Sequence, residues 1–224
     1  MRNTVRALPA VRAHVCNHPR SPTDIQRGQV VGALSSLKRF GQGPSWSPVV
    51  TVSQSASLKD ALVQDSTGGS TNPCSTVFSG TGAFSEPESQ ALRDIIEQHK
   101  ENTIAYITVH SYGQYWLYPW GYTSDLPDDV AHLDQAARAA VSALTATYGT
   151  DYIIGSSTNA LYAAAGGSDD WAKGGAGVKY SYTLELRDKG SFILPVSQIE
   201  PTLKETWNGL IALCNEILHI EATK

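Results

Sequence analysis

From about residue 85 to the end of the chain, short β-branched runs alternate with amphipathic helical patterns, and this alternation limits the possible folds most strongly. The apolar residues recur at helical spacing over about 86–100, 128–148 and 197–218. The strand-like runs cover about 103–109, 152–155 and 179–186. Strands and helices in alternation indicate an α/β fold, in which helices pack on a β-sheet.

Two of the predicted helices begin with a capping box, in which Ser is followed three residues later by Glu. These are the tetrapeptides SEPE at 85–88 and SQIE at 197–200. In each of them the Ser side chain is expected to cap the first turn. Gly149 is the expected stop of the middle helix, since glycine readily adopts the left-handed conformation that ends helices.

The first 69 residues show no sustained periodicity and are expected to form an unrelated, disordered leader, with one folded domain over 70–224. The two parts differ in charge. Residues 1–70 hold eight Lys or Arg against three Asp, whereas residues 71–224 hold nine against eighteen acidic residues. The basic charges are scattered along the leader, and the net charge of −4 gives no drive toward nucleic acid. No apolar run is long enough to cross a bilayer, and no secretory signal is visible.

Several classes of enzyme are excluded by the absence of their motifs. The sequence has no GxSxG nucleophile elbow, no phosphate-binding GxxxxGK[ST] loop and no GxGxxG dinucleotide motif. The three cysteines are too far apart in sequence for a CxxC metal knuckle, and their number leaves the pairing open.

Two residues at strand ends are candidates for chemistry. His110 follows the run 103–109, at the position where α/β enzymes place functional groups. Glu185 lies near the end of the run 179–186 and shares a strand face with Thr183, so it could serve as a general base. The structural alternatives are a hydrogen-bonded structural histidine and an ion pair of Glu185 with Arg187 on the same strand face.

Several motifs in a fixed order resemble the zinc metallocarboxypeptidases of the digestive A and B type, peptidase family M14. The resemblance covers about 150 residues in the C-terminal two-thirds of the chain. The matching stretches are NPCS at 72–75, VHSYGQ at 109–114, LYPWGY at 117–122, LY at 161–162, GGSDDW at 166–171, KYSYTLELRD at 179–188, LP at 194–195, QI at 198–199 and ETW at 205–207.

The resemblance implies a mixed β-sheet between helices and a role for each of five residues. His110 would be a zinc ligand, and Glu185 would activate the zinc-bound water and pass its proton to the leaving amine. Tyr162 would close over the substrate, and Tyr112 would line the subsites before the scissile bond. Asp169 would lie in the pocket for a terminal Lys or Arg. As an alternative, Asp169 and Asp170 could cap a short helix that begins near Trp171. The implied partners are peptide or protein C-termini, and the implied location is extracellular.

The family's other two zinc ligands come from an HxxE motif, and no histidine of this sequence is followed three residues later by Glu. The Asn-Arg pair that grips the substrate carboxylate is also absent. We therefore expect the N-terminal half of the catalytic domain to be missing, with apolar surface exposed where it would pack. Two hypotheses remain: a zinc-dependent metallocarboxypeptidase, or a noncatalytic remnant that binds a peptide or a partner without metal.

Overall fold

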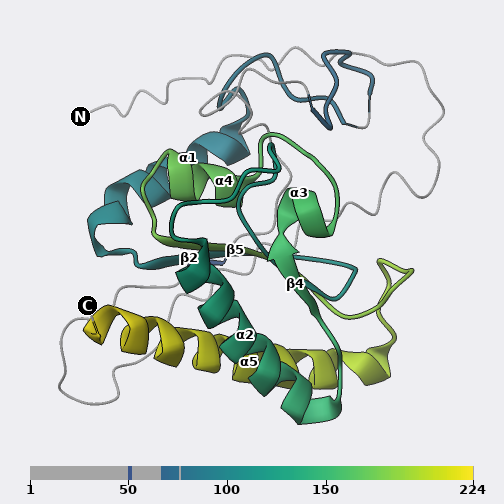
Figure 1. Cartoon of the computed structure of the whole chain (residues 1–224). Helices are drawn as coiled ribbons and strands as arrows, with labels where there is room; N and C mark the ends of the chain where they lie inside the picture. Colours follow the sequence, from purple (N-terminus) through teal and green to yellow (C-terminus); the bar gives the residue numbers. More distant parts are fainter. Residues whose placement is uncertain (1–49, 52–66, 76, 224) are drawn as a thin grey trace, which may run out of the picture.

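The computed structural model describes residues 50–51, 67–75 and 77–223, and these residues form a layered α/β fold (Figure 1). Their sheet has five strands in the order β1-β2-β5-β3-β4. Strand β3 runs antiparallel to β5, and the other neighbouring strands are parallel. The strands are β1 (Val50–Thr51), β2 (Ala105–His110), β3 (Tyr115–Tyr118), β4 (Ile153–Ser156) and β5 (Tyr180–Glu185).

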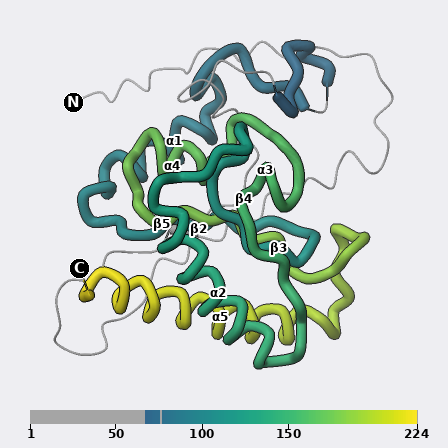
Figure 2. Tube along the Cα trace, in the orientation of Figure 1, coloured from purple at the N-terminus to yellow at the C-terminus, as the bar shows by residue number. Residues whose placement is uncertain are grey.

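Helices cover both faces of this sheet, which confirms the predicted α/β architecture. Helices α2 and α5 pack side by side below the sheet in the view of Figures 1 and 2, and α1 and α4 lie above it. The helices are α1 (Pro87–His99), α2 (Val130–Tyr148), α3 (Ser157–Ala160), α4 (Ser168–Gly174) and α5 (Val196–Ala222), with a 3₁₀ turn η2 (Lys100–Asn102) after α1.

The alternation of side chains along the two central strands places different chemistry on the two faces of the sheet. Tyr180, Tyr182 and Leu184 of β5 belong to the larger apolar cluster, which α2 and α5 also build. Their neighbours Ser181, Thr183 and Glu185 point to the opposite face, as the alternation predicts. The polar face of β5 therefore lies on the side of α4.

Both capping-box predictions are wrong in detail. Helix α1 begins at Pro87 after Glu86, and the Ser85 hydroxyl donates to the Glu86 carboxylate instead of capping the helix. Helix α5 begins at Val196 after Pro195, so Ser197 lies inside the first turn and cannot be the cap. Neither helix has a side-chain hydrogen bond from its N-cap residue, which is Glu86 in α1 and Pro195 in α5. A proline at the boundary fixes φ near the helical value and lets the helix start without such a cap.

Helix α5 carries apolar residues on two opposite faces, and this explains why its amphipathic pattern was misleading. The face that packs on α2 and the sheet includes Leu213 and Ile217, which are buried. Leu203 and Trp207, which lie within the helical pattern predicted over about 197–218, are exposed to 64% and 44%. Apart from β1 and residues 67–69, the predicted leader lies outside the described residues.

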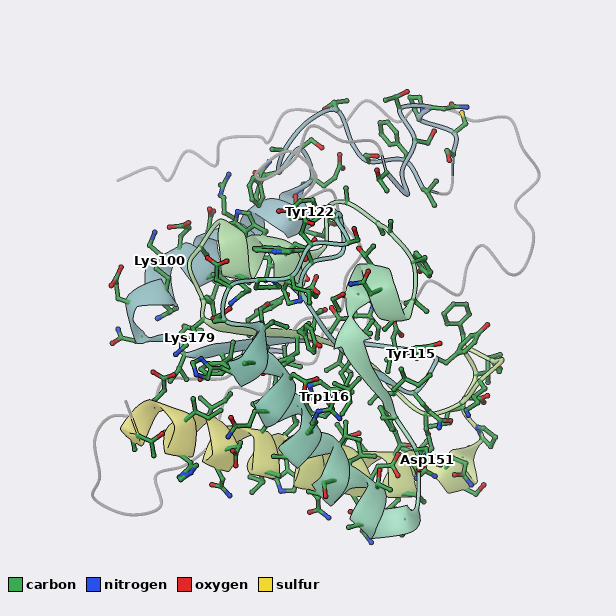
Figure 3. All side chains as sticks on the ribbon, in the orientation of Figure 1. Lys100, Tyr115, Trp116, Tyr122, Asp151 and Lys179 are labelled. Carbon is green, nitrogen blue, oxygen red and sulfur yellow. The ribbon has the colours of Figure 1, made fainter. Side chains whose placement is uncertain are left out.

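Gly209 allows α5 to approach α2 closely. A Cβ at this position would lie 3.2 Å from the Ala140 carbonyl oxygen and 3.3 Å from the ring of Trp116, which is labelled in Figure 3. Gly209→Leu is expected to lower the free energy of unfolding by about 2–3 kcal/mol, because the added side chain overpacks this crossing. Gly209→Ala should be close to neutral, because a helix-propensity gain of about 1 kcal/mol offsets mild crowding. Urea denaturation checks both values, and equal stabilities for the two variants would contradict the close approach.

No helix in the described ranges is long and apolar enough to span a membrane.

Candidate functional site

His110 and Glu185 lie side by side because each ends one of two adjacent parallel strands. The register of β2 and β5 pairs their Cα atoms directly. The distance from His110 Nδ1 to Glu185 Oε1 is 3.9 Å. The carboxyl ends of parallel strands meet at one edge of a sheet, and this edge is where α/β folds place their sites. The geometry brings together the two residues that the sequence analysis selected.

Thr108 occupies the position two residues before His110 and contacts its ring from the same strand face. Thr108 Oγ1 lies 2.9 Å from His110 Nε2. Burial lowers the pKa of His110, and the neighbouring Asp169 carboxylate partly opposes this shift. A neutral ring that donates from Nε2 to Thr108 keeps its lone pair on Nδ1, on the side of Glu185.

The Glu185 carboxyl group is largely buried, and one of its two oxygens makes no hydrogen bond with the described residues. Its side chain is 16% exposed, and burial raises the pKa of Glu185 to about 7. Within the described residues, Oε2 has no hydrogen-bond partner. A carboxyl group whose pKa lies near neutrality can both accept and return a proton at neutral pH, as a general base must.

The raised pKa of Glu185 makes a prediction about stability. The folded protein holds the Glu185 proton more tightly than the unfolded chain does. Protonation of Glu185 therefore stabilises the fold below about pH 4.5, and this contribution is lost as the pH rises through 7. Glu185→Gln should therefore raise the free energy of unfolding by about 2–3 kcal/mol at pH 8 and have little effect at pH 4. Urea denaturation in the presence of a chelator measures both, with the exposed Glu101→Gln as control. A gain of equal size at the two pH values would contradict the raised pKa of Glu185.

Asp169 and Asp170 lie in the first turn of α4, which two hydroxyl groups hold against the sheet. The Ser181 hydroxyl donates to the Asp169 backbone carbonyl at 2.8 Å, and the Tyr106 hydroxyl donates to Ser168 Oγ at 2.9 Å. The helix begins at Ser168 after Gly167, without a side-chain cap. The alternative in which the two aspartates cap this helix is therefore wrong, because both lie inside it.

Both aspartates are buried carboxyl groups, but their surroundings differ. Burial raises the pKa of Asp169, and hydrogen bonds from Thr183 and from the backbone oppose this. Asp169 is 5% exposed, and its Oδ2 has no hydrogen-bond partner within the residues that the structure describes. Asp170 accepts the Gly121 amide with both of its oxygens at 3.0 Å, while burial raises its pKa to about 8. Asp169 thus has one oxygen, Oδ2, that is buried and has no hydrogen-bond partner among the described residues, and we call it the open oxygen.

The two predicted tyrosines lie outside this buried group. Tyr162 follows α3 and is 66% exposed. Tyr112 is half-buried, and its ring meets that of Phe192 edge-on at 4.9 Å. The structure therefore brings His110, Glu185 and Asp169 together and leaves Tyr162 on an exposed loop.

Arg187 pairs with Glu205 of α5, so the ion pair that the sequence analysis considered between Arg187 and Glu185 is wrong. The Arg187 guanidinium donates to both Glu205 oxygens, to Thr150 Oγ1 and to Gln198 Oε1. Beyond the end of β5 the chain turns toward α5, which leaves Glu185 without this partner. In the sequence, the feature that points to this ion pair is Glu205, a charged residue on the face of α5 that packs in the interior.

Among the residues that the structure describes, the donors that a catalytic zinc needs do not converge. Zinc sites of hydrolases use three protein ligands, usually His, Glu or Cys. In the ranges 50–51, 67–75 and 77–223, no three His, Cys, Asp or Glu residues lie close enough to hold a metal ion. His110 is the single predicted ligand at the site, so the described residues do not fit a zinc ion by themselves.

Comparisons with known proteins agree on one family. The family model described as zinc carboxypeptidase matches residues 59–209. Carboxypeptidase B of Astacus astacus is 56% identical over 153 residues, which is 67% of this chain and 50% of that protein. Carboxypeptidase B of Bos taurus is 48% identical over 63% of this chain and 34% of its own length. The chain thus spans half or less of the length of these curated relatives.

Solved structures give the same result for the fold. Bovine thrombin-activatable fibrinolysis inhibitor, solved in complex with tick carboxypeptidase inhibitor, matches with a TM-score of 0.65 and 38% identity, over 68% of this chain and 52% of that one. Carboxypeptidase A from Helicoverpa armigera matches with a TM-score of 0.66 and 31% identity, over 75% of this chain and 42% of that one.

Proposed function

Because this chain belongs to the zinc carboxypeptidase family, we propose that it acts on peptide C-termini, as a metallocarboxypeptidase that removes a terminal Lys or Arg. The observation that carries this proposal is the group formed at one edge of the sheet by the partly buried His110 and Glu185 and the buried Asp169. The match to two proteins named carboxypeptidase B supports the same substrate class.

Asp169 is the residue that we assign to the terminal side chain. An ionised carboxylate in a buried site is unfavourable unless a cation compensates its charge. The open Oδ2 atom of Asp169 can accept a hydrogen bond from a guanidinium or an ammonium group, and such charge-assisted bonds are about twice as strong as neutral ones. A neutral terminal side chain would leave this oxygen uncompensated, so the site favours Lys and Arg.

Glu185 is the residue that we assign to proton transfer. Its buried carboxyl group takes a proton from the attacking water and returns it to the amine that leaves, so its proton count is unchanged over one cycle. His110 would be one ligand of the family's zinc ion, which polarises the scissile carbonyl group when bound. The described residues supply no complete ligand set, and we therefore assign no step to the metal.

The remaining parts of the proposal concern substrate access. Tyr162 would close over the bound C-terminus from its exposed loop, and Tyr112 would contact the residues before the scissile bond. The substrates would be extracellular peptides or proteins, by similarity to the family.

A second candidate is binding of the same C-termini without hydrolysis. The metal-binding side chains at the site favour this noncatalytic candidate, because one imidazole cannot hold a hydrolytic zinc and the sequence has no HxxE motif. This candidate keeps the role of Asp169 and removes that of Glu185.

Mass spectrometry of peptides that end in Arg, Lys, Phe or Glu tests the proposal. Each peptide is incubated with the purified chain and added zinc, and the bound zinc is counted by elemental analysis. The enzyme predicts release of Arg and Lys only, and loss of this release in Glu185→Gln. Binding of the Arg peptide without release supports the noncatalytic candidate, and absence of both binding and release refutes the two together.

A further inference from the structure

Asp170, the neighbour of Asp169, fastens α4 to the segment that follows β3. Both of its carboxylate oxygens accept the Gly121 backbone amide at 3.0 Å, and the Tyr122 amide also donates to it. Asp170 is 3% exposed. Figure 3 labels Tyr122 next to α4 in the upper part of the molecule. Residues 119–122 and the helix that carries Asp169 are therefore held by one buried carboxylate.

The same glycine also fastens the loop that carries Tyr162. The Gly121 carbonyl accepts the Ala164 amide at 2.7 Å. A Cβ at Gly121 would lie 3.0 Å from the Ala164 carbonyl oxygen and 3.3 Å from Asp170 Oδ2. The three segments thus meet at Gly121 with no room for a side chain. We call Gly121, Ala164 and Asp170 the clasp.

The two adjacent aspartates have different bonding, which suggests different functions. Both oxygens of Asp170 accept the Gly121 amide, whereas Asp169 Oδ2 has no hydrogen-bond partner among the described residues. The backbone amides that donate to Asp170 oppose the rise in its pKa that burial causes, and they hold its carboxyl group in one orientation. Asp169 lies immediately before Asp170 on the same short helix, so its orientation depends on how the clasp holds that helix.

We propose that Asp170 and Gly121 are positioning residues for recognition of a basic terminal side chain: the clasp holds the open oxygen of Asp169 and the Tyr162 loop in one arrangement. This inference rests on the proposed function, because it requires that Asp169 binds the cation. Asp170 itself contacts backbone amides and not the substrate. Its removal should therefore weaken the preference for a cation while leaving binding of a neutral analogue nearly unchanged.

The test compares two peptides that differ only in the last residue, arginine or its neutral isostere citrulline. Titration calorimetry gives the dissociation constant of each, and their ratio measures recognition of the charge. Asp170→Asn should reduce this ratio by about tenfold, because the new amide group repels the Gly121 amide and releases α4. Gly121→Ala should reduce it by about threefold to tenfold with every charge retained, because the methyl group separates the three segments. Asp128→Asn, on an exposed aspartate, is the matched control and should leave the ratio unchanged.

Asp169→Asn separates failure of this inference from failure of the proposed function. If Asp169→Asn leaves the ratio unchanged, both are wrong. If Asp169→Asn brings the ratio of the two dissociation constants to one while Asp170→Asn and Gly121→Ala keep the wild-type ratio, the proposed function stands and the clasp has no role in recognition. Hydrogen exchange of the wild-type chain decides the case in which the variants do not fold. The Gly121 and Ala164 amides should exchange more slowly with the arginine peptide than with the citrulline peptide, and equal rates would overturn the proposal.

Discussion

Arg187→Met is expected to lower the free energy of unfolding by about 3–5 kcal/mol, because it leaves a buried carboxylate without its cation. Glu205 is fully buried in α5, and the Arg187 side chain is 14% exposed. The guanidinium compensates the Glu205 charge and also donates to Gln198 of α5 and to Thr150 before β4, so its removal breaks contacts with two other parts of the chain. Urea denaturation at neutral pH measures the loss.

Two further variants identify the cause of this loss. Arg138→Met breaks an exposed pair with Asp134 on one face of α2 and should cost less than about 1 kcal/mol. Adding Glu205→Gln to Arg187→Met should recover much of the stability, because the uncompensated charge is then removed. Equal losses for Arg187→Met and Arg138→Met would show that the Glu205 charge is not buried as described.

Asp169→Asn is expected to weaken binding of an arginine-ended peptide by about 10-fold to 100-fold, because a charge-assisted hydrogen bond contributes about 1.5–3 kcal/mol. The substitution keeps the size of the side chain and removes its charge. It should also raise the stability of the free protein, since an uncharged amide then replaces a buried ionisable group whose Oδ2 atom has no hydrogen-bond partner among the described residues. Calorimetric titration gives the affinity, and urea denaturation gives the stability.

A loss of both affinity and stability in Asp169→Asn would mean that the residue has a structural function only. Asp128→Asn, an exposed change, should leave both quantities unchanged. Opposite signs for the two effects are the signature of a carboxylate that is kept for a ligand.

The central strands and long helices were predictable from the sequence because their apolar residues recur at a regular period. Strand β3 was not predicted: Tyr115–Tyr118 is a run of four residues, and three of them are buried. A short buried run has no period from which a strand can be recognised. The exposed residues of α5, such as Leu203, were not separable from its buried ones, because one periodic pattern cannot show which of two apolar faces packs on the sheet.

The pair of His110 and Glu185 was predictable because each residue ends a strand, and adjacent parallel strands bring their ends together. The partner of Arg187 was not, because Glu205 is distant in sequence and its burial follows from how α5 packs. The clasp was also missed, since a backbone amide such as that of Gly121 carries no residue-specific signal.

The affinity of the wild-type chain for two peptides, one ending in arginine and one in citrulline, tests the central claim most directly. The two side chains have nearly the same shape and differ in charge, so the comparison isolates the open oxygen of Asp169. We expect the arginine peptide to bind at least about tenfold more tightly, as a charge-assisted hydrogen bond implies. Equal affinities would show that this carboxylate does not recognise a basic C-terminal residue.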